Sequence, residues 1–533
     1  MSQRTNLSQS LERIRKLAWA LELTLFVAGV VMVLPLWVVF RPPIQDLPQH
    51  VAAVRVLSSF ADPTYRFQEY FELTLGRTQY LTVYLLAAPL AKVMGPTLAI
   101  KAVLSLALIL TPLSISRLLR VLAFDPWLAC LGLPFVFNVH VGYGFLNFLA
   151  AIPILFYGLA LAVDQLRQPS AKRGVGLALV CFGCFYTHVV PFGLLIIAIF
   201  GLTRFNRGAL VRQAAIVVPS ATALLGWLLL SPAGKVVSSL GRLESDTPAP
   251  MTHLPFGQAL RVLPDWIIHI TTDENENLRV IVWFVVAIAL LVLSVVCSGN
   301  RTETEPLATR EPTLVRARLV VLLLVPLSLV AYFALPNGYG FIWPICQRFP
   351  ILAILLGLPL FARAPHWAIR IAAVVSLCLV VAAANEQSTI FRAAADKGYR
   401  GFDEVIEKIP KGSRVATLVF ERQLEGLQLS PLMHAAGWLQ AERGGIVMFS
   451  FAEFPSSPFT YRANRRPPPV APRWEWGPER VVPDRDLGWY DYCLVQGWSG
   501  SLEASRRFSE VWRRGRWSLW RRTGPADPDP SNP

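Results

Sequence analysis

Asp46 and His50 are the first two side chains whose types and spacing suggest chemistry. They lie in residues 42–50 (PPIQDLPQH), where prolines on both sides of Asp46 restrict the backbone and would fix its carboxylate. A fixed, partly desolvated carboxylate can act as a general base for an acceptor hydroxyl or orient a cationic partner. His50 follows at helical i,i+4 spacing and is predicted to share that face and supply a hydrogen bond or a proton. The alternative is that Asp46 only caps a helix beginning near Pro48.

A second group of candidates lies in two polar interruptions of apolar sequence. Residues 137–148 (FNVHVGYGFLNF) form a glycine-rich break, and non-helical backbone at membrane depth is tolerated only where it is buried in protein or lines a cavity. We therefore predict that His140, Tyr143 and Asn147 face a cavity and bind substrate, with a purely structural helix break as the alternative. His188, next to a proline in residues 186–191 (YTHVVP), is a further substrate-binding candidate or a satisfied packing residue.

Arg348 ends the loop formed by residues 336–350 (PNGYGFIWPICQRFP) and precedes another apolar run. Its guanidinium could bind a phosphate through two parallel hydrogen bonds, while Trp343 packs against lipid or sugar. The alternative is that Arg348 extends to lipid headgroups as an anchor. The acidic residues 273–277 (DENEN) are more typical of a solvated helix cap than of a metal site, so no metal or other cofactor is predicted.

The composition places these residues in a polytopic membrane protein. Of 533 residues, 54% are apolar and only 16% are charged, and the mean hydropathy is +0.46, which is unusual for a soluble enzyme or a disordered chain. The net charge of +15 comes from Lys and Arg in short stretches between apolar segments, a pattern of membrane topology signals rather than of a nucleic-acid surface. The chain lacks a P-loop, a dinucleotide fingerprint, an H-E-x-x-H motif and a G-x-S-x-G elbow.

The apolar runs predict a bundle of ten to thirteen transmembrane helices within residues 17–384. Residues 1–16 are basic and predicted to be cytoplasmic, and residues 41–78 form the first extracytoplasmic loop, with a helix over 51–60 along the membrane surface. Two full crossings between residues 80 and 116 would place Arg117 and Arg120 outside, so one of those two runs is predicted to be re-entrant or a half-span. After residue 40 the apolar runs cover residues 80–94, 97–116, 121–139, 145–165, 174–187, 189–203, 213–230, 280–298, 319–335, 349–362 and 367–384.

Residues 385–523 are predicted to form a small extracytoplasmic α/β domain. Short β-branched or aromatic runs bounded by turn residues predict strands, and helical spacing predicts two helices over 402–408 and 434–442. The proline-rich residues 524–533 are predicted to be a disordered tail. The predicted strands cover residues 415–420, 445–451, 491–496, 508–513 and 517–520, the last two as a closing hairpin.

The chain resembles the GT-C superfamily of polytopic membrane glycosyltransferases, which includes protein-mannosyltransferase-like and aminoarabinose-transferase-like enzymes. The features in common are a short N-terminus, one helix, a first loop with an acidic residue, many further helices and a C-terminal domain. Residues 46–50, 144–148, 187–188 and 347–349 also look like signatures of uncharacterised bacterial proteins near that superfamily. The resemblance implies a GT-C helix bundle in the bacterial inner membrane, Asp46 as the catalytic acidic residue, and a sugar on polyprenyl phosphate as donor. Many members carry a closely spaced acidic pair in this loop, whereas here the next acidic residue after Asp46 is Asp62.

These observations predict an inverting transferase that moves a sugar from polyprenyl phosphate to an extracytoplasmic glycan, lipid or protein, in contact with membrane lipids and without nucleic acid. Asp46 and His50 are the predicted catalytic residues. Alternatives are a transporter or flippase of lipid-linked glycans and a non-catalytic envelope scaffold, which a dry interior around Asp46 would favour. The predicted substrate-binding residues are His140, Tyr143, Asn147, His188, Trp343 and Arg348.

Overall fold

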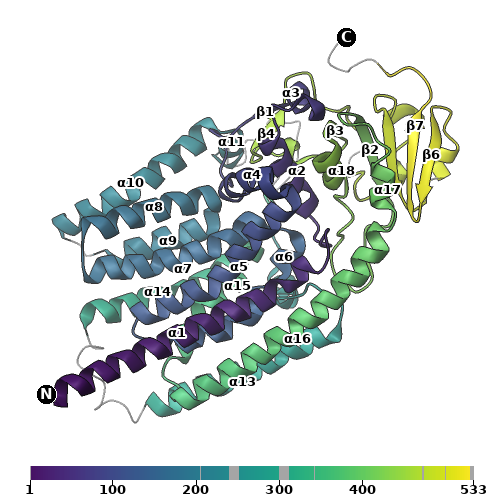
Figure 1. The fold of residues 1–533 in the computed structure, drawn as a ribbon. Coiled ribbons are helices and arrows are strands. Elements are labelled where there is room, and N and C mark those ends of the chain that lie inside the picture. Colours follow the sequence, from purple (N-terminus) through teal and green to yellow (C-terminus); the bar gives the residue numbers. More distant parts are fainter. Residues whose placement is uncertain are drawn as a thin grey trace.

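The computed structural model describes residues 2–203, 206–238, 251–298, 311–340, 342–470, 473–498 and 500–527, and the side chains from residue 19 onward. A helical bundle carries a domain with a β-sheet at the end away from the N-terminus (Figure 1). The main bundle helices are α1 (Ser2–Trp37), α4 (Thr82–Met94), α5 (Pro96–Val121), α7 (Leu146–Arg167), α8 (Ala171–Thr187), α9 (Val189–Leu202), α10 (Arg207–Leu230), α13 (Glu274–Ser298), α14 (Pro312–Ala334), α15 (Phe349–Gly357) and α16 (His366–Tyr399). The predicted fold class, a mainly helical membrane bundle with a small C-terminal α/β domain, is confirmed.

Seven of the described helices are long and apolar enough to cross a membrane: α1, α5, α7, α10, α13, α14 and α16. The outer faces of the bundle are apolar and exposed; only 11% of the apolar window of α10 and 22% of that of α13 are buried. Exposed apolar surface on this scale is typical of contact with lipid. The protein is therefore a multi-pass membrane protein.

Each predicted apolar run contains a helix, but several helices are shorter than a bilayer. The 13 residues of α4 rise about 20 Å at 1.5 Å per residue, less than the roughly 30 Å of a hydrocarbon core. This agrees with the half-span predicted between residues 80 and 116. The run over 121–139 forms the 3₁₀ helix η2 (Pro126–Phe135), and the predicted ten to thirteen crossings exceed the seven helices of full length.

Basic connectors gather at the end of the bundle opposite the sheet. Arg120 forms an ion pair with Glu22 at 2.6 Å, and Arg167 forms one with Glu311 at 3.4 Å. The first contact joins the end of α5 to the start of the apolar part of α1. The second joins the end of α7 to the residue before α14. The positive-inside pattern read from the sequence thus corresponds to one physical end of the molecule.

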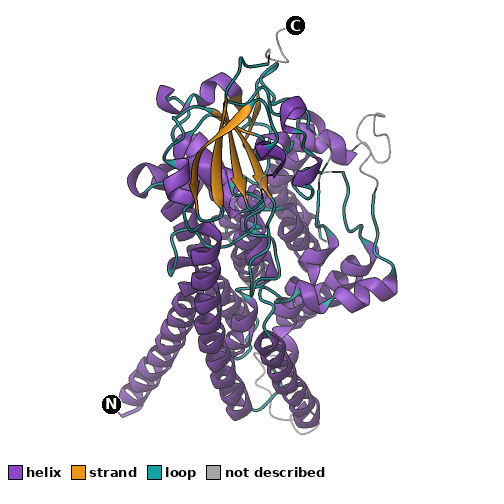
Figure 2. Ribbon diagram, turned by 90° about the vertical axis from the view of Figure 1, so that its right-hand side faces the viewer, coloured by secondary structure: helices purple, strands orange, loops and turns teal. Residues whose placement is uncertain are grey.

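The C-terminal domain contains a mixed five-stranded sheet, whose strands lie side by side at one end of the helical bundle in Figure 2. Parallel pairing of β2 with β3 and β5 is followed by an antiparallel hairpin, and the order is β3-β2-β5-β7-β6. The strands are β2 (Arg414–Val419), β3 (Ile446–Val447), β5 (Tyr492–Gln496), β6 (Phe508–Arg514) and β7 (Trp517–Arg522), and the principal helices are α17 (Phe402–Ile406) and α18 (Ala436–Arg443). All the predicted strand segments contain a strand of this sheet.

The predicted domain boundary at residue 385 and the predicted tail both differ from the structure. Helix α16 continues through Asn385 to Tyr399, because its later turns keep a buried face that includes Gln387 and Phe391 although their mean hydropathy falls. At the other end, Asp527 is held by an ion pair with Arg507 at 2.7 Å. Residues 524–527 are therefore part of the fold, and residues 528–533 lie outside the described chain.

The first loop is covered by the C-terminal domain. Its helix α2 (Leu47–Ser58) is mostly buried and packs on α18, α4 and α5 rather than lying exposed along a membrane surface. A Cβ on Gly437 of α18 would lie 2.3 Å from the Pro48 carbonyl carbon, so only glycine permits this approach. Arg41 pairs with Asp403 and Glu442, and the strand β1 (Phe71–Leu73) pairs with β4 (Phe459–Tyr461). Loop and domain thus form one cap on the bundle.

The remaining short helices connect these parts. They are η1 (Pro63–Tyr65), α3 (Phe67–Tyr70), α6 (Val139–Tyr143), α11 (Pro232–Ser238), α12 (Phe256–Val262), η3 (Pro264–Trp266), η5 (Cys346–Arg348), η6 (Leu358–Phe361), η7 (Phe451–Glu453), η8 (Pro478–Arg480), α19 (Pro483–Asp486) and α20 (Gly500–Glu503).

Candidate functional site

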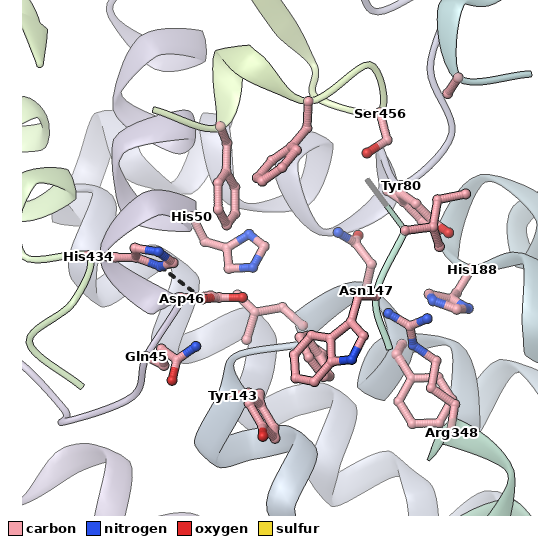
Figure 3. Close-up of a pocket in the computed structure, with 18 of the residues that line it drawn as sticks. Gln45, Asp46, His50, Tyr80, Tyr143, Asn147, His188, Arg348, His434 and Ser456 are labelled. Carbon is pink, nitrogen blue, oxygen red and sulfur yellow. Dashed lines mark ion pairs between the residues drawn. The ribbon is translucent and has the colours of Figure 1, made fainter. Parts of the chain in front are cut away.

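A cavity of about 560 Å³ lies where the bundle meets the cap (Figure 3). Seven of the eight predicted site residues line it, and the cap domain adds a wall of aromatic side chains. We call this space the main cavity. His140 does not line it; its ring is fully buried behind Phe148, with centroids 4.9 Å apart. The predicted residues that do line it are Asp46, His50, Tyr143, Asn147, His188, Trp343 and Arg348.

Asp46 occupies the N-cap position of α2, but its side chain accepts no hydrogen bond from the first turn. The side chain is therefore not used for capping. Its Oδ1 instead lies 2.9 Å from Nδ1 of His434, and Figure 3 shows this ion pair inside the cavity. Both side chains are largely buried, at 16% and 11% exposure, and neither of these two atoms has another hydrogen-bond partner in the described structure. The Asp46 carboxylate therefore lies against a histidine supplied by the C-terminal domain.

The glycine-rich break in residues 137–148 supports the backbone of Asp46. The amides of Gln45 and Asp46 donate to the carbonyls of Gly142 and Tyr143, each at 3.0 Å. Gly144 has φ +88°, and a Cβ there would lie 3.1 Å from the Asp46 Cβ. The glycine-rich segment therefore packs closely against the backbone of the first loop, and some of its side chains also line the cavity.

His50 contacts Tyr84 rather than Asp46. Its Nδ1 lies 2.7 Å from the Tyr84 hydroxyl, and its ring packs edge-on against Phe451 at 5.2 Å. Burial lowers the pKa of His50 to about 4, so the ring is neutral near pH 7. The prediction that His50 shares the face of Asp46 fits its place in the cavity, but its hydrogen bond leads away from the carboxylate.

His434 is the site residue that the sequence did not reveal. It lies just before α18 in the cap, and its ring stacks on Phe449 with centroids 4.8 Å apart. Residues 434–442 were predicted only as helix, because helical spacing says nothing about a partner in a loop far away in the sequence. The pairing depends on how the cap docks on α2.

Arg348 lies at the other end of the main cavity. The side chain is only 9% exposed, and one guanidinium nitrogen donates to the Pro344 carbonyl of its own loop. Nε is buried without a partner, and no carboxylate among the described residues is within ion-pair distance. The guanidinium lies 5.3 Å from the centre of the Phe145 ring. Burial argues against the headgroup-anchor alternative and leaves a cation that an external anion can pair with.

His188 and Asn147 complete the Arg348 end. The His188 Nδ1 accepts a hydrogen bond at 3.1 Å from the Val190 amide and so caps α9, while the ring lies over Tyr80 at 5.0 Å. His188 therefore has the structural role given as its alternative and also lines the cavity. The Asn147 Oδ1 is buried without a partner, which leaves it free to accept a hydrogen bond from a ligand.

The acidic residues 273–277 match the predicted solvated helix cap only in part, because Asp273 accepts a hydrogen bond from the Asn275 amide at an exposed position whereas Glu276 is 1% exposed. Glu276 is buried and accepts hydrogen bonds from the amides of Ile270 and Thr271, at 3.1 Å and 2.9 Å. Across the described residues, no group of three or more His, Cys, Asp or Glu side chains is arranged to hold a metal ion.

The fold and the site together define a class: a multi-pass membrane protein with a cavity between its helical bundle and an α/β cap. No protein-family model matches the chain, and no curated protein matches it in sequence. Among solved structures it is similar to ArnT from Cupriavidus metallidurans, in the apo state and bound to undecaprenyl phosphate, at 12% identity. The similarity covers 95% of this chain and 98% and 99% of those chains, with TM-scores of 0.48 and 0.47.

Proposed function

We propose that the protein is a membrane glycosyltransferase that moves a sugar from a polyprenyl phosphate to an acceptor hydroxyl outside the cytoplasm. The observation that carries this proposal is the pair of chemistries in one cavity: a carboxylate held by a histidine at one end and a buried guanidinium without a carboxylate partner at the other. A lipid-phosphate sugar supplies the anion for Arg348. An acceptor hydroxyl supplies the proton for Asp46.

The reaction follows from these two ends. The Asp46 carboxylate takes the proton of the acceptor O–H as the oxygen forms a bond to the anomeric carbon. The bond from that carbon to the phosphate oxygen breaks, and polyprenyl phosphate leaves with both electrons and with its charge beside Arg348. A single displacement inverts the anomeric configuration. His434 does not touch the reacting atoms in this scheme and acts by holding Asp46.

The size and lining of the cavity favour an enzyme over the non-catalytic scaffold. A scaffold predicts a dry interior around Asp46, whereas a cavity of about 560 Å³ lies within the roughly 300–1,000 Å³ typical of ligand sites. Aromatic residues Phe449, Phe451 and Phe454 close its cap side and suit a sugar ring or an isoprenoid chain.

The decisive experiment offers purified protein in liposomes a set of undecaprenyl-phosphate sugars with a mixture of glycan and lipid acceptors from a bacterial envelope. We expect release of undecaprenyl phosphate and a glycosylated product of inverted anomeric configuration. Movement of the intact donor across the liposome membrane without any covalent product would instead establish the transporter alternative.

We further propose that the protein resides in the bacterial inner membrane with the cap outside and the N-terminus in the cytoplasm. The basic connectors at the end opposite the cap support this orientation. In a cysteine-free background, single cysteines at the exposed positions Glu72 and Ala504 should react with an impermeant label in spheroplasts. A cysteine at exposed Lys172, next to the basic connectors, should not react. The reverse pattern would reject the orientation.

A further inference from the structure

A second cavity, of about 330 Å³, lies on the other side of an aromatic partition from the main cavity. Tyr143 and Trp343 line both cavities and so form the wall between them. The rings of Phe145, Tyr143 and Trp266 are stacked, at 5.0 Å and 5.6 Å with interplanar angles of 1° and 14°. Trp343 packs edge-on against Tyr143 and Trp266. The stack runs from Phe145 in the main cavity to Trp266 in the second.

The polar groups of the second cavity differ from those of the main cavity. Its described lining has no Lys or Arg, whereas the main cavity has Arg348 and Arg473. Asp265 is paired with His269 at 3.0 Å, but its side chain is 49% exposed, so it can accept further hydrogen bonds. An anionic phosphate is therefore disfavoured in the second cavity, and a neutral ligand with hydroxyl donors is favoured.

A buried amide gives a second, independent indication of a ligand. Gln347 is 1% exposed and donates to Asn337, but its Oε1 is buried without a hydrogen-bond partner. An unsatisfied buried acceptor is destabilising, and a hydrogen bond from a ligand hydroxyl would relieve that cost. Gln428 of the cap lines the same cavity with an exposed side chain.

We propose that the second cavity binds a neutral pyranose unit of the acceptor, with its C–H face on Trp266 and its hydroxyls on Asp265 and Gln347. A planar indole, a carboxylate and an amide are the groups that recognise a sugar ring, which is apolar on its faces and polar around its edge. The description of this sugar as the acceptor rests on the proposed function; the binding of a pyranose does not. Tyr143 and Trp343 would then lie between this pyranose unit and the donor phosphate.

The test is saturation-transfer NMR on the full chain in lipid nanodiscs, with glucose, galactose, mannose and N-acetylglucosamine as probes. We expect saturation transfer to at least one probe, and about tenfold weaker binding in both Trp266→Ala and Asp265→Asn. Trp266→Phe keeps an aromatic face and should retain most of the binding. Undecaprenyl phosphate binding, measured on the same samples, should be unchanged in all three variants and shows that they are folded.

Two results would overturn the proposal. One is the absence of transfer to any of the four sugars, or equal binding in wild type, Trp266→Ala and Asp265→Asn. The other is loss of sugar binding in Asp46→Asn, which would place the sugar in the main cavity. If the sugar binds as expected but no donor is ever turned over, the proposed function fails while the pyranose site stands.

Discussion

The two ends of the main cavity differ in the sign of their buried charge and in whether the protein supplies a partner for it. At one end the Asp46 carboxylate faces His434 at 2.9 Å, so its partner is supplied by the protein. At the other end Arg348 contacts a backbone carbonyl and the rings of Phe145 and Phe148, and the described residues supply it with no carboxylate. The first end therefore holds a carboxylate beside a histidine. The second end holds a buried cation without a counter-ion among the described residues.

The electrostatic free energies at the two ends of the cavity favour one orientation of a charged ligand. A buried charge without a counter-ion costs several kcal/mol, and contact with aromatic rings returns only about 0.5–2 kcal/mol. A phosphate at Arg348 would remove the remainder of that cost. A second anion at the Asp46 end would instead be repelled by the carboxylate. A ligand with one charged and one neutral end therefore has a single favourable orientation, with the phosphate at Arg348.

The largest effect should come from removing the base. We expect Asp46→Asn to lower the transfer rate by about 10²–10⁴-fold, the usual contribution of general base catalysis, while undecaprenyl phosphate binding is kept. The matched control is Asp62→Asn, because Asp62 lies in the same loop but is exposed and accepts a hydrogen bond from the Thr64 amide at 2.9 Å. Full transfer by Asp46→Asn in the donor-release assay would remove Asp46 from the mechanism.

The next largest effect should come from replacing Arg348 and should appear in the affinity for undecaprenyl phosphate. Arg348→Lys keeps the charge but loses the planar pair of donors, so we expect a loss of about 1.5–3 kcal/mol, or roughly ten- to a hundredfold, in undecaprenyl phosphate affinity. Arg370→Lys is a matched control, because Arg370 is paired with Asp125 and neither residue lines the cavity. Equal affinities of Arg348→Lys and wild type, by titration in nanodiscs, would mean that the two ends do not differ as described.

The contrast between the ends also marks what the sequence could predict. Arg348, His188 and Asn147 were found because polar residues that interrupt apolar runs are rare and conspicuous. The sheet strands were found because β-branched runs between turn residues carry a local signal. Such signals need only neighbouring residues, so they survive without knowledge of the fold.

His434 and the buried position of α2 could not be predicted in this way. Both depend on the docking of the cap, which uses Gly437 against Pro48 and Arg41 against Asp403. No local periodicity encodes a contact between residues so far apart. The domain boundary predicted at residue 385 differs from the structure for a related reason. Falling hydropathy indicates where a helix leaves the membrane. The helix itself continues for as long as its residues favour helix and one of its faces is packed, as α16 does to Tyr399.

His50, which lines the main cavity with Asp46, should make the free energy of unfolding depend on pH. Burial lowers its pKa to about 4 in the folded protein from 6.5, so the unfolded chain takes up a proton first as pH falls. The stability from this group is therefore complete above pH 6.5 and is lost as pH falls toward 4. At pH 5 the loss should be about 2 kcal/mol. We expect His50→Gln to lose correspondingly less stability than wild type between pH 7 and pH 5 in thermal unfolding. Parallel pH curves for the two proteins would contradict the burial of a neutral His50.

The smallest effect should come from His434, which orients the base without touching substrate. We expect His434→Ala to lower kcat about tenfold and to leave KM and undecaprenyl phosphate affinity unchanged, because only the alignment of Asp46 is lost. Added imidazole should restore part of the rate by occupying the space left beside the carboxylate. Ser456→Ala, another cap residue at the cavity, should show neither the loss nor the rescue. A structural defect in cap docking would raise KM and would not respond to imidazole. Rescue of kcat alone would therefore show that His434 positions Asp46 and does not merely pack in the cap. It would also show that a residue of the cap contributes to the alignment of the base.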